Sequence, residues 1–340
     1  MAFKIRNRLR PFSMFTLSPF RLVWILVLCI QCQTPEPEEP TSMDLQLSDE
    51  TQPRSEDSPA SYQPSTTQSD INSSDAQQTT QSLEDPEDEL EYFDGEGSEF
   101  VKACKEAQAS GPDHPLVRIL LEPDETCSTA FLRLNSSSLI DLAGKNITDI
   151  SFLKSLKKTE HLILTDNKIN RLETLAQLSQ LESLDISFNQ IHDLSPLSSL
   201  KNLRSLNAEH NKIEDLGPLA NLVKLEEVML SHNQISQLTP LTQLRSVNQL
   251  SLAQNKIKDL MPLKNLNNLS QLDISSNELE RCDGLEYLLS LSVLDLSRNP
   301  LKDISPVTHL KSLDELYLHE VPADLNLSPL DQLPLAQLYQ

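Results

Sequence analysis

The chain has 340 residues, of which 50 are acidic and 28 basic, giving a formal net charge of −22. This balance excludes a typical nucleic-acid-binding protein, which needs a basic stripe. The charge is uneven, because residues 1–32 carry +5 whereas residues 33–100 carry −18. The chain has only six glycines, and none forms a glycine-rich phosphate loop.

Residues 1–32 have the pattern of an export signal. Residues 1–21 contain five basic residues and no acid, and an apolar run from Leu22 to Ile30 follows them. A basic segment before a short apolar one is typical of a secretory signal peptide. The run is shorter than the ~20 residues of a membrane span. Cys32 comes just before a polar tract and resembles the lipidation site of bacterial lipoproteins, with Cys29 as the alternative. The resemblance implies an N-terminal lipid anchor in a membrane; ordinary cleavage and secretion is the alternative.

Residues 33–97 form an acidic tract rich in Ser, Thr, Gln and Pro. Such a segment has too little apolar surface to offset the entropy lost on ordering. We expect a disordered tether that holds the following domain away from the membrane.

Residues 98–135 are expected to form an N-terminal helical cap. Phe100 and Cys104 lie on one face of a predicted helix, and a stacked repeat array needs its first apolar edge covered. A disulfide between Cys104 and Cys127 is plausible in an exported protein, with two free thiols as the alternative. Cys282 occupies a slot that other repeats fill with Leu or Ile, so we expect a buried small hydrophobe.

Residues 136–320 are organised by an asparagine that recurs at a constant spacing along the chain. The two apolar residues of each Leu-x-Leu phrase share one face of a short strand, and stacked strands form a parallel sheet. The amide that closes each phrase is expected to bond backbone groups in the turn. The seven members of this asparagine ladder are Asn167, Asn189, Asn211, Asn233, Asn255, Asn277 and Asn299.

The second half of the repeat places a proline at the same offset after most of these asparagines. Ser195, Thr239 and Ser305 precede three of the prolines. Ser or Thr as an N-cap before a proline favours the start of a helix. The pattern therefore predicts a short helical or 3₁₀ segment on the convex side of the array.

The phrase L-x-x-L-x-L-x-x-N-x-I, followed by D-L-x-P-L-x-x-L, resembles a leucine-rich repeat. Its 22-residue length resembles the class found in bacterial internalins and in the leucine-rich regulators of protein phosphatase 1. The resemblance covers about residues 139–320 and implies an α/β solenoid, a horseshoe with one short parallel strand and one short helical or 3₁₀ turn per repeat. Residues 321–340 keep leucines without the full motif, and we expect a C-terminal cap.

Leucine-rich repeat proteins usually bind protein ligands through the concave face, and the resemblance implies the same use here. The exposed strand positions are small, polar and mildly acidic, so a basic protein segment is the best electrostatic match. Few belong to the residue types that dominate interface energies, which implies weak or transient binding through this face, or binding elsewhere. The candidate binding face comprises Asp185, Asn207, Glu209, Glu227, Met229, Asp273, Asp295, Glu315 and Tyr317.

No constellation of residues indicates catalysis, a metal or another cofactor. His210 and His232 are expected to stack on adjacent rungs, but two imidazoles fall short of the three or four ligands of a zinc site. We expect a monomeric, non-enzymatic protein-binding module displayed at the cell envelope. The alternatives are an intracellular regulatory scaffold resembling the phosphatase 1 regulators and a structural envelope protein without a specific ligand.

Overall fold

The computed structural model describes residues 95–111 and 114–340. The predicted signal peptide, with Cys29 and Cys32, and nearly all of the predicted tether lie outside the described residues. Within the described part, no helix combines the length and the apolar character that crossing a membrane requires.

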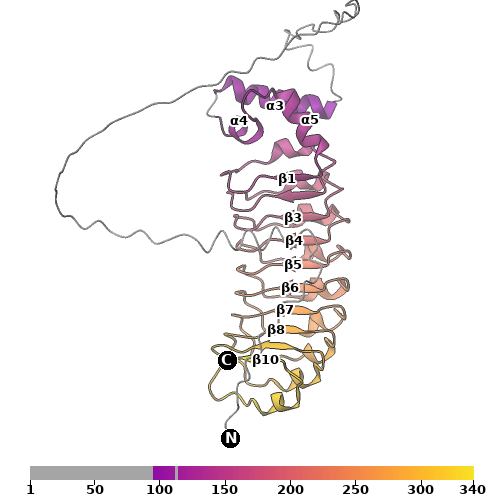
Figure 1. Cartoon of the computed structure of the whole chain (residues 1–340), viewed down its shortest axis with the longest axis vertical. Helices are drawn as coiled ribbons and strands as arrows, with labels where there is room; N and C mark the ends of the chain where they lie inside the picture. The colour runs from indigo at the N-terminus through magenta and orange to yellow at the C-terminus, as the bar shows by residue number, and fades with distance from the viewer. Residues whose placement is uncertain (1–94, 112–113) are drawn as a thin grey trace, which may run out of the picture. The chain divides into compact units, whose positions relative to one another are not determined.

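Ten short strands form one parallel sheet, in which the sheet order is the sequence order (Figure 1). Each strand pairs with the next strand along the chain at the matching repeat position, as Leu184 does with Leu206. The predicted solenoid fold is thereby confirmed. The strands are β1 (Leu139–Asp141), β2 (His161–Ile163), β3 (Ser183–Asp185), β4 (Ser205–Asn207), β5 (Glu227–Met229), β6 (Gln249–Ser251), β7 (Gln271–Asp273), β8 (Val293–Asp295), β9 (Glu315–Tyr317) and β10 (Gln337–Tyr339).

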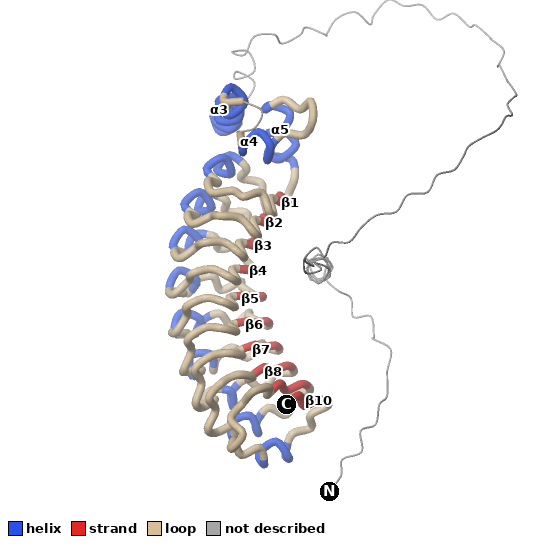
Figure 2. The backbone as a smooth tube through the Cα atoms, turned by 90° about the vertical axis from the view of Figure 1, so that its left-hand side faces the viewer, coloured by secondary structure: helices blue, strands red, loops and turns tan. Residues whose placement is uncertain are grey.

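A 3₁₀ segment follows each of the first nine strands and lies on the convex side of the curved array (Figure 2). Short 3₁₀ turns suit this position because they reverse the chain within a few residues. The segments are η1 (Ser151–Ser155), η2 (Glu173–Gln177), η3 (Ser195–Ser199), η4 (Gly217–Leu219), η5 (Thr239–Gln243), η6 (Met261–Leu263), η7 (Leu285–Tyr287), η8 (Ser305–His309) and η9 (Ser328–Gln332).

The expectation that Ser or Thr caps these segments is wrong. Ser195 is already the first residue of η3, and its side chain makes no capping bond there. Instead, the Asp193 carboxylate accepts the backbone N–H of Ser195 at 2.8 Å. Asp303 accepts the N–H of Ser305 in the same way. A carboxylate shortly before the turn satisfies the donor that the 3₁₀ geometry leaves unpaired.

The core is a column of leucine and isoleucine side chains between the sheet and the 3₁₀ segments. In the rung of β3, the side chains of Leu184, Ile186, Leu197 and Leu200 are all at most 1% exposed. Burial of one such side chain contributes about 1.5–3 kcal/mol. Because every rung repeats the same set, the core runs without a break from the N-terminal cap to the last strands.

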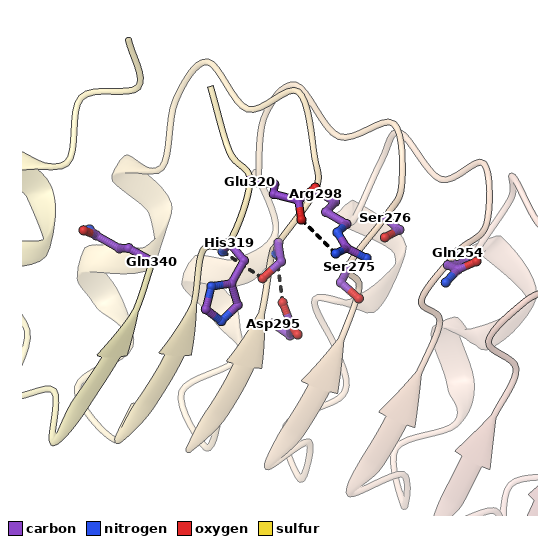
Figure 3. A pocket seen from close by; sticks show the side chains of 9 residues that line it. Gln254, Ser275, Ser276, Asp295, Arg298, His319, Glu320 and Gln340 are labelled. Carbon is purple, nitrogen blue, oxygen red and sulfur yellow. Dashed lines mark hydrogen bonds and ion pairs between the residues drawn. The ribbon is translucent and has the colours of Figure 1, made fainter. Parts of the chain in front are cut away.

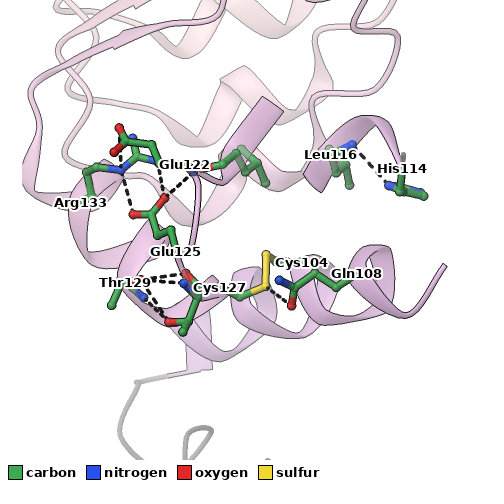
Figure 4. The surroundings of a disulfide bond; sticks show 11 residues. Cys104, Gln108, His114, Leu116, Glu122, Glu125, Cys127, Thr129 and Arg133 are labelled. Carbon is green, nitrogen blue, oxygen red and sulfur yellow. Dashed lines mark hydrogen bonds and ion pairs between the residues drawn. A yellow bond between two sulfur atoms is a disulfide. The ribbon is translucent and has the colours of Figure 1, made fainter. Parts of the chain in front are cut away.

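Three helices cover the first rung: α3 (Gly95–Ala109), α4 (Pro115–Leu120) and α5 (Cys127–Ser136). Cys104 of α3 and Cys127 of α5 are joined by a disulfide (Figure 4). The rings of Phe100 in α3 and Phe131 in α5 pack against each other, with their centroids 5.3 Å apart. Thr126 starts α5 with a reciprocal capping box.

The last residues form one more rung. Val321 stands where the ladder would place an asparagine, yet β10 pairs with β9 in the same register as the earlier strands. Leu338, in the middle of β10, is 42% exposed because no further rung covers it. The sequence pattern predicts only a cap over residues 321–340 and does not reveal this strand.

Candidate functional site

The asparagine ladder fixes the backbone on which the concave face is built. Asn233 donates from Nδ2 to the carbonyl oxygens of Ala208, Leu230 and Ser231, at 3.0–3.2 Å. Its Oδ1 accepts the N–H of Ile213 at 3.0 Å. The other six asparagines of the ladder repeat this arrangement, so each amide joins its own turn to the preceding rung.

The residue before each asparagine has a left-handed backbone, with φ between 51° and 56°. This conformation is uncommon for residues other than glycine. It turns the chain away from the strand and directs the side chain to the rim of the concave face. The positions are Asp166, Phe188, His210, His232, Gln254, Ser276 and Arg298, and Glu320 has the same conformation in the rung that lacks an asparagine.

The nine residues of the candidate binding face lie on the concave side, on strands β3 to β9 or, for Glu209, just beyond β4. Asn207 differs from the others because its side chain is only 4% exposed, so the expectation that it is exposed is wrong. Its Nδ2 donates to Oδ2 of Asp185 at 3.1 Å, and its Oδ1 accepts the N–H of Glu209. Asn207 therefore supports its neighbours and offers little surface to a ligand.

Three carboxylates on this face are partly withdrawn from water. Burial raises the pKa of Asp185, Glu209 and Asp273 above the ordinary values, although hydrogen bonds from nearby side chains oppose the shift. The charge of Asp295 next to Asp273 raises the pKa of Asp273 further. Negative charge held in a desolvated floor interacts strongly with an incoming cation.

Two shallow hollows lie in the C-terminal half of this face. The larger, of about 510 Å³, is lined mainly by polar side chains of the turns, including Arg298, His319 and Glu320 (Figure 3). The smaller, of about 210 Å³, lies over the strands between Met229 and Tyr317. Both are lined by Asp295, which places this carboxylate where the two hollows meet.

An aromatic pair closes the C-terminal end of the face. The rings of Tyr317 and Tyr339 are parallel within 4°, with their centroids 4.3 Å apart. The Tyr317 hydroxyl donates to Oε2 of Glu315 at 2.8 Å, and this bond raises the pKa of the phenol. Tyr339 is not among the binding residues predicted from the sequence. It follows Tyr317 by one full repeat, and this spacing is the sequence signal that could have placed it on the same face.

A second stack lies on the rim. The rings of His210 and His232 stack as predicted, with centroids 3.7 Å apart, and Phe188 extends the stack at 4.1 Å. Burial and the neighbouring His232 lower the pKa of His210. Phe188 occupies the same repeat position as the two histidines, but it is not among the residues predicted from the sequence. Among residues 95–111 and 114–340, no three potential metal ligands come together.

The comparison with known proteins agrees with this architecture. Residues 160–199 and 201–243 match the family model described as leucine rich repeats (2 copies). No curated protein matches the sequence significantly.

Solved structures with the same fold include two internalins of Listeria monocytogenes. The chain is 32% identical to InlF, with a TM-score of 0.56 over 61% of each chain. It is 26% identical to InlC2, with a TM-score of 0.55 over 62% of this chain and 94% of that one. A leucine-rich repeat protein of Leptospira interrogans, 24% identical over 58% of this chain and 59% of that one, shares the fold with a TM-score of 0.52.

The chain thus spans 61% of the InlF structure and nearly all of the InlC2 structure. The repeat motif, the in-register parallel sheet and these comparisons lead to the same assignment. The repeats of this chain are leucine-rich repeats.

Proposed function

We propose that the protein is a non-enzymatic binding module displayed at the cell envelope, which contacts a protein ligand through the concave face of its sheet. The observation that carries the proposal is the face itself. One rigid ten-stranded sheet presents partly desolvated carboxylates, two shallow hollows and an aromatic pair on a single surface. Such a surface suits an extended polypeptide better than a small substrate, which usually needs a deeper apolar cleft.

The charge of the face favours a ligand with a basic surface. Asp185, Asp273 and Asp295 occupy the same position on three rungs, and Glu227 and Glu315 add charge at the first position of their strands. Complementary charge across an interface contributes more to association rate and specificity than to affinity. We therefore expect ligand binding to weaken with salt.

A steric block in the centre of the face tests the proposal. Ser251 lies on β6 at the middle of the sheet, whereas Gln243 ends η5 on the convex side. Ser251→Trp should abolish capture of the native ligand by the full chain, and Gln243→Trp should leave it unchanged. Equal capture by both variants would contradict binding through the concave face.

The proposed location rests on the N-terminal sequence. We propose that Cys32, or alternatively Cys29, carries the lipid that anchors the protein. The intact mass of the mature protein from the membrane fraction, beside Cys32→Ala and Cys29→Ala variants, tests this assignment. A start at one acylated cysteine is the expected result. A cleaved but unmodified protein would make it a secreted binder, and an intact Met1 would favour the intracellular scaffold.

A further inference from the structure

The smaller hollow of the concave face has the size of one side chain. Its volume of about 210 Å³ lies below the roughly 300–1,000 Å³ of small-molecule sites. Its lining includes the apolar side chains of Met229 and Val293, the carboxylates of Asp273 and Asp295, and the ring of Tyr317. A hollow with apolar walls and an acidic side suits a long cationic side chain, whose stem is apolar and whose head is charged.

The lining follows one column of the sheet. The third residues of successive strands pair in register, so their order along the column is their order in the sequence. Neighbouring strands lie about 4.8 Å apart. Between β5 and β10, this column holds an apolar residue, a small polar residue, two acids and two aromatic residues, in that order. These are Met229, Ser251, Asp273, Asp295, Tyr317 and Tyr339.

The two acids of this column keep an unused oxygen. Asp273 accepts the N–H and hydroxyl of Ser275 through Oδ1, and Asp295 accepts the N–H of Ser297 through Oδ1. Within the part of the chain that the structure describes, no hydrogen bond is donated to Oδ2 of either residue. Asp185, at the same position in β3, differs because its Oδ2 already accepts from Asn207.

A guanidinium of the chain itself lies near Asp295 but is engaged elsewhere. The charge of Asp295 contributes to the raised pKa of Arg298 at the rim, but Nη2 of Arg298 is 2.8 Å from Oε1 of Glu320 (Figure 3). The carboxylate of Asp295 therefore faces the hollows with an unsatisfied acceptor.

Tyr317 supplies a flat surface on the other side of the hollow. One face of its ring is covered by Tyr339, in a nearly parallel stack, and the opposite face is turned toward the rung of Asp295. The bond from its hydroxyl to Glu315 fixes the ring in this orientation. A planar cation placed above Asp295 would form the next layer of the stack, within the ~6 Å at which cation–π attraction operates.

We infer that this hollow is a subsite for an arginine side chain of the protein ligand, with the guanidinium stacked on Tyr317 and donating to Oδ2 of Asp295. The charge of Asp273, one rung further, adds attraction, and the aliphatic stem lies along Val293 on the strand of Asp295. This inference rests on the proposed binding through the concave face. Arginine fits better than lysine because its head is planar and presents several donors in one plane.

The test uses the full chain labelled with 3-fluorotyrosine, whose five tyrosines give separate fluorine resonances. The probes are three capped pentapeptides, Gly-Gly-X-Gly-Gly, in which X is arginine, lysine or citrulline, the neutral isostere of arginine. We expect saturable shifts of the Tyr317 and Tyr339 resonances with arginine. Lysine should bind at least about fivefold more weakly, and citrulline should cause no saturable shift. Tyr287, which is 50% exposed on η7, should not move.

Two matched variants separate the subsite from general acidity. Asp295→Asn should weaken arginine binding about tenfold, as expected for the loss of a charge-assisted hydrogen bond. Asp141→Asn removes one charge from the same strand position in β1, away from the hollow, and should leave arginine binding essentially unchanged. Equal responses to arginine and citrulline, or equal effects of Asp295→Asn and Asp141→Asn, would overturn the assignment.

Failure of the subsite and failure of the proposed function give different results. If arginine leaves Tyr317 unchanged while Ser251→Trp still abolishes capture of the native ligand, the arginine subsite is wrong and binding through the concave face stands. If Ser251→Trp has no effect on capture, the proposed function itself is wrong.

Discussion

The side-chain amide of Asn233 donates to the carbonyl oxygen of Ala208, in the preceding repeat, at 3.0 Å. This bond crosses from one rung of the solenoid to the one before it. Together with the bond that Oδ1 accepts from Ile213, it satisfies backbone groups that the turn would otherwise bury without partners. The ladder therefore sets the spacing and orientation of the strands that carry the concave face.

Asn233→Ala is expected to lower the free energy of unfolding by about 3 kcal/mol, because it leaves a buried N–H and three carbonyl oxygens without the amide. Denaturant unfolding of the full chain measures the effect. Asn221→Ala is the matched control, because Asn221 is exposed on the convex side, and it should change stability by less than about 0.5 kcal/mol. Equal effects of the two substitutions would contradict the structural role of the ladder.

Gly284→Ala is expected to destabilise the protein by at least about 2 kcal/mol. Gly284 has a φ of 106°, and an added Cβ would lie 2.9 Å from backbone atoms of Leu260 and Met261. Gly111 also has a positive φ, of 118°, but faces open space. Gly111→Ala should therefore cost only the backbone strain, about 1 kcal/mol. Thermal or denaturant unfolding compares the two, and a larger loss at Gly111 would be inconsistent with the described backbone contact.

Loss of the disulfide should loosen the N-terminal cap. Cys104 and Cys127 are separated by 23 positions in the sequence, and closing a loop of that size contributes about 3 kcal/mol in the chain-entropy treatment. In the Cys104→Ser, Cys127→Ser double variant, we expect hydrogen exchange to accelerate in α3 and α5 more than in β5 to β7. A reducing agent should have the same effect on the wild type and none on the double variant. Unchanged exchange in the cap would contradict the bond's role there.

The carboxylates should titrate in two groups. Burial raises the pKa of Asp185 and Asp273 above the ordinary Asp value of 3.8, whereas hydrogen bonds from Ser195 and Ser305 lower those of Asp193 and Asp303. Carboxyl carbon shifts followed by NMR between about pH 2 and about pH 7 measure all four. Lower pKa values for Asp185 and Asp273 than for Asp193 and Asp303 would contradict the burial of the two acids on the concave face.

The sign of the stability effect follows from these shifts. Because the pKa of Asp185 is raised on folding, its contribution to stability is full below the ordinary Asp value and is lost as the pH rises through the folded pKa. Asp193 has the opposite effect, since its contribution is present above the ordinary value and is lost as the pH falls through the lowered pKa. In the Asp185→Asn variant, the free energy of unfolding should therefore fall less than in the wild type as the pH rises above about 4. Unfolding at several pH values measures this difference.

The solenoid was predictable because its signal is repeated. A constant spacing between asparagines, with apolar residues at fixed offsets, determines strand, turn and register in every rung at once. Strand β10 was harder to predict, because Val321 replaces the asparagine of the repeat motif. Only the 22-residue spacing of Leu338 and Tyr339 from their partners in β9 indicates the strand. The sequence did not predict the capping role of Asp193, because Ser195 directly before a proline has the residue type preferred at an N-cap. Only the backbone geometry shows that Ser195 is already inside the 3₁₀ segment and that Asp193 accepts its N–H.

The properties of the candidate site were less accessible from the sequence. Alternation along a strand places Asp185, Asn207 and Asp295 on the concave face, but it does not say which oxygen is already bonded. That depends on contacts with near neighbours in the chain, as with Ser297, and with the adjacent rung, as between Asp185 and Asn207. For the same reason, the burial of Asn207 and the stacking of Tyr317 on Tyr339 required the structure.

Site-specific photocrosslinking in the native cell tests the central claim most directly. A photoreactive amino acid replaces either Ser251 on the concave side or Gln243 on the convex side. We predict one dominant protein adduct from position 251 and none from position 243. Adducts from position 243 with none from position 251 would contradict binding through the concave face.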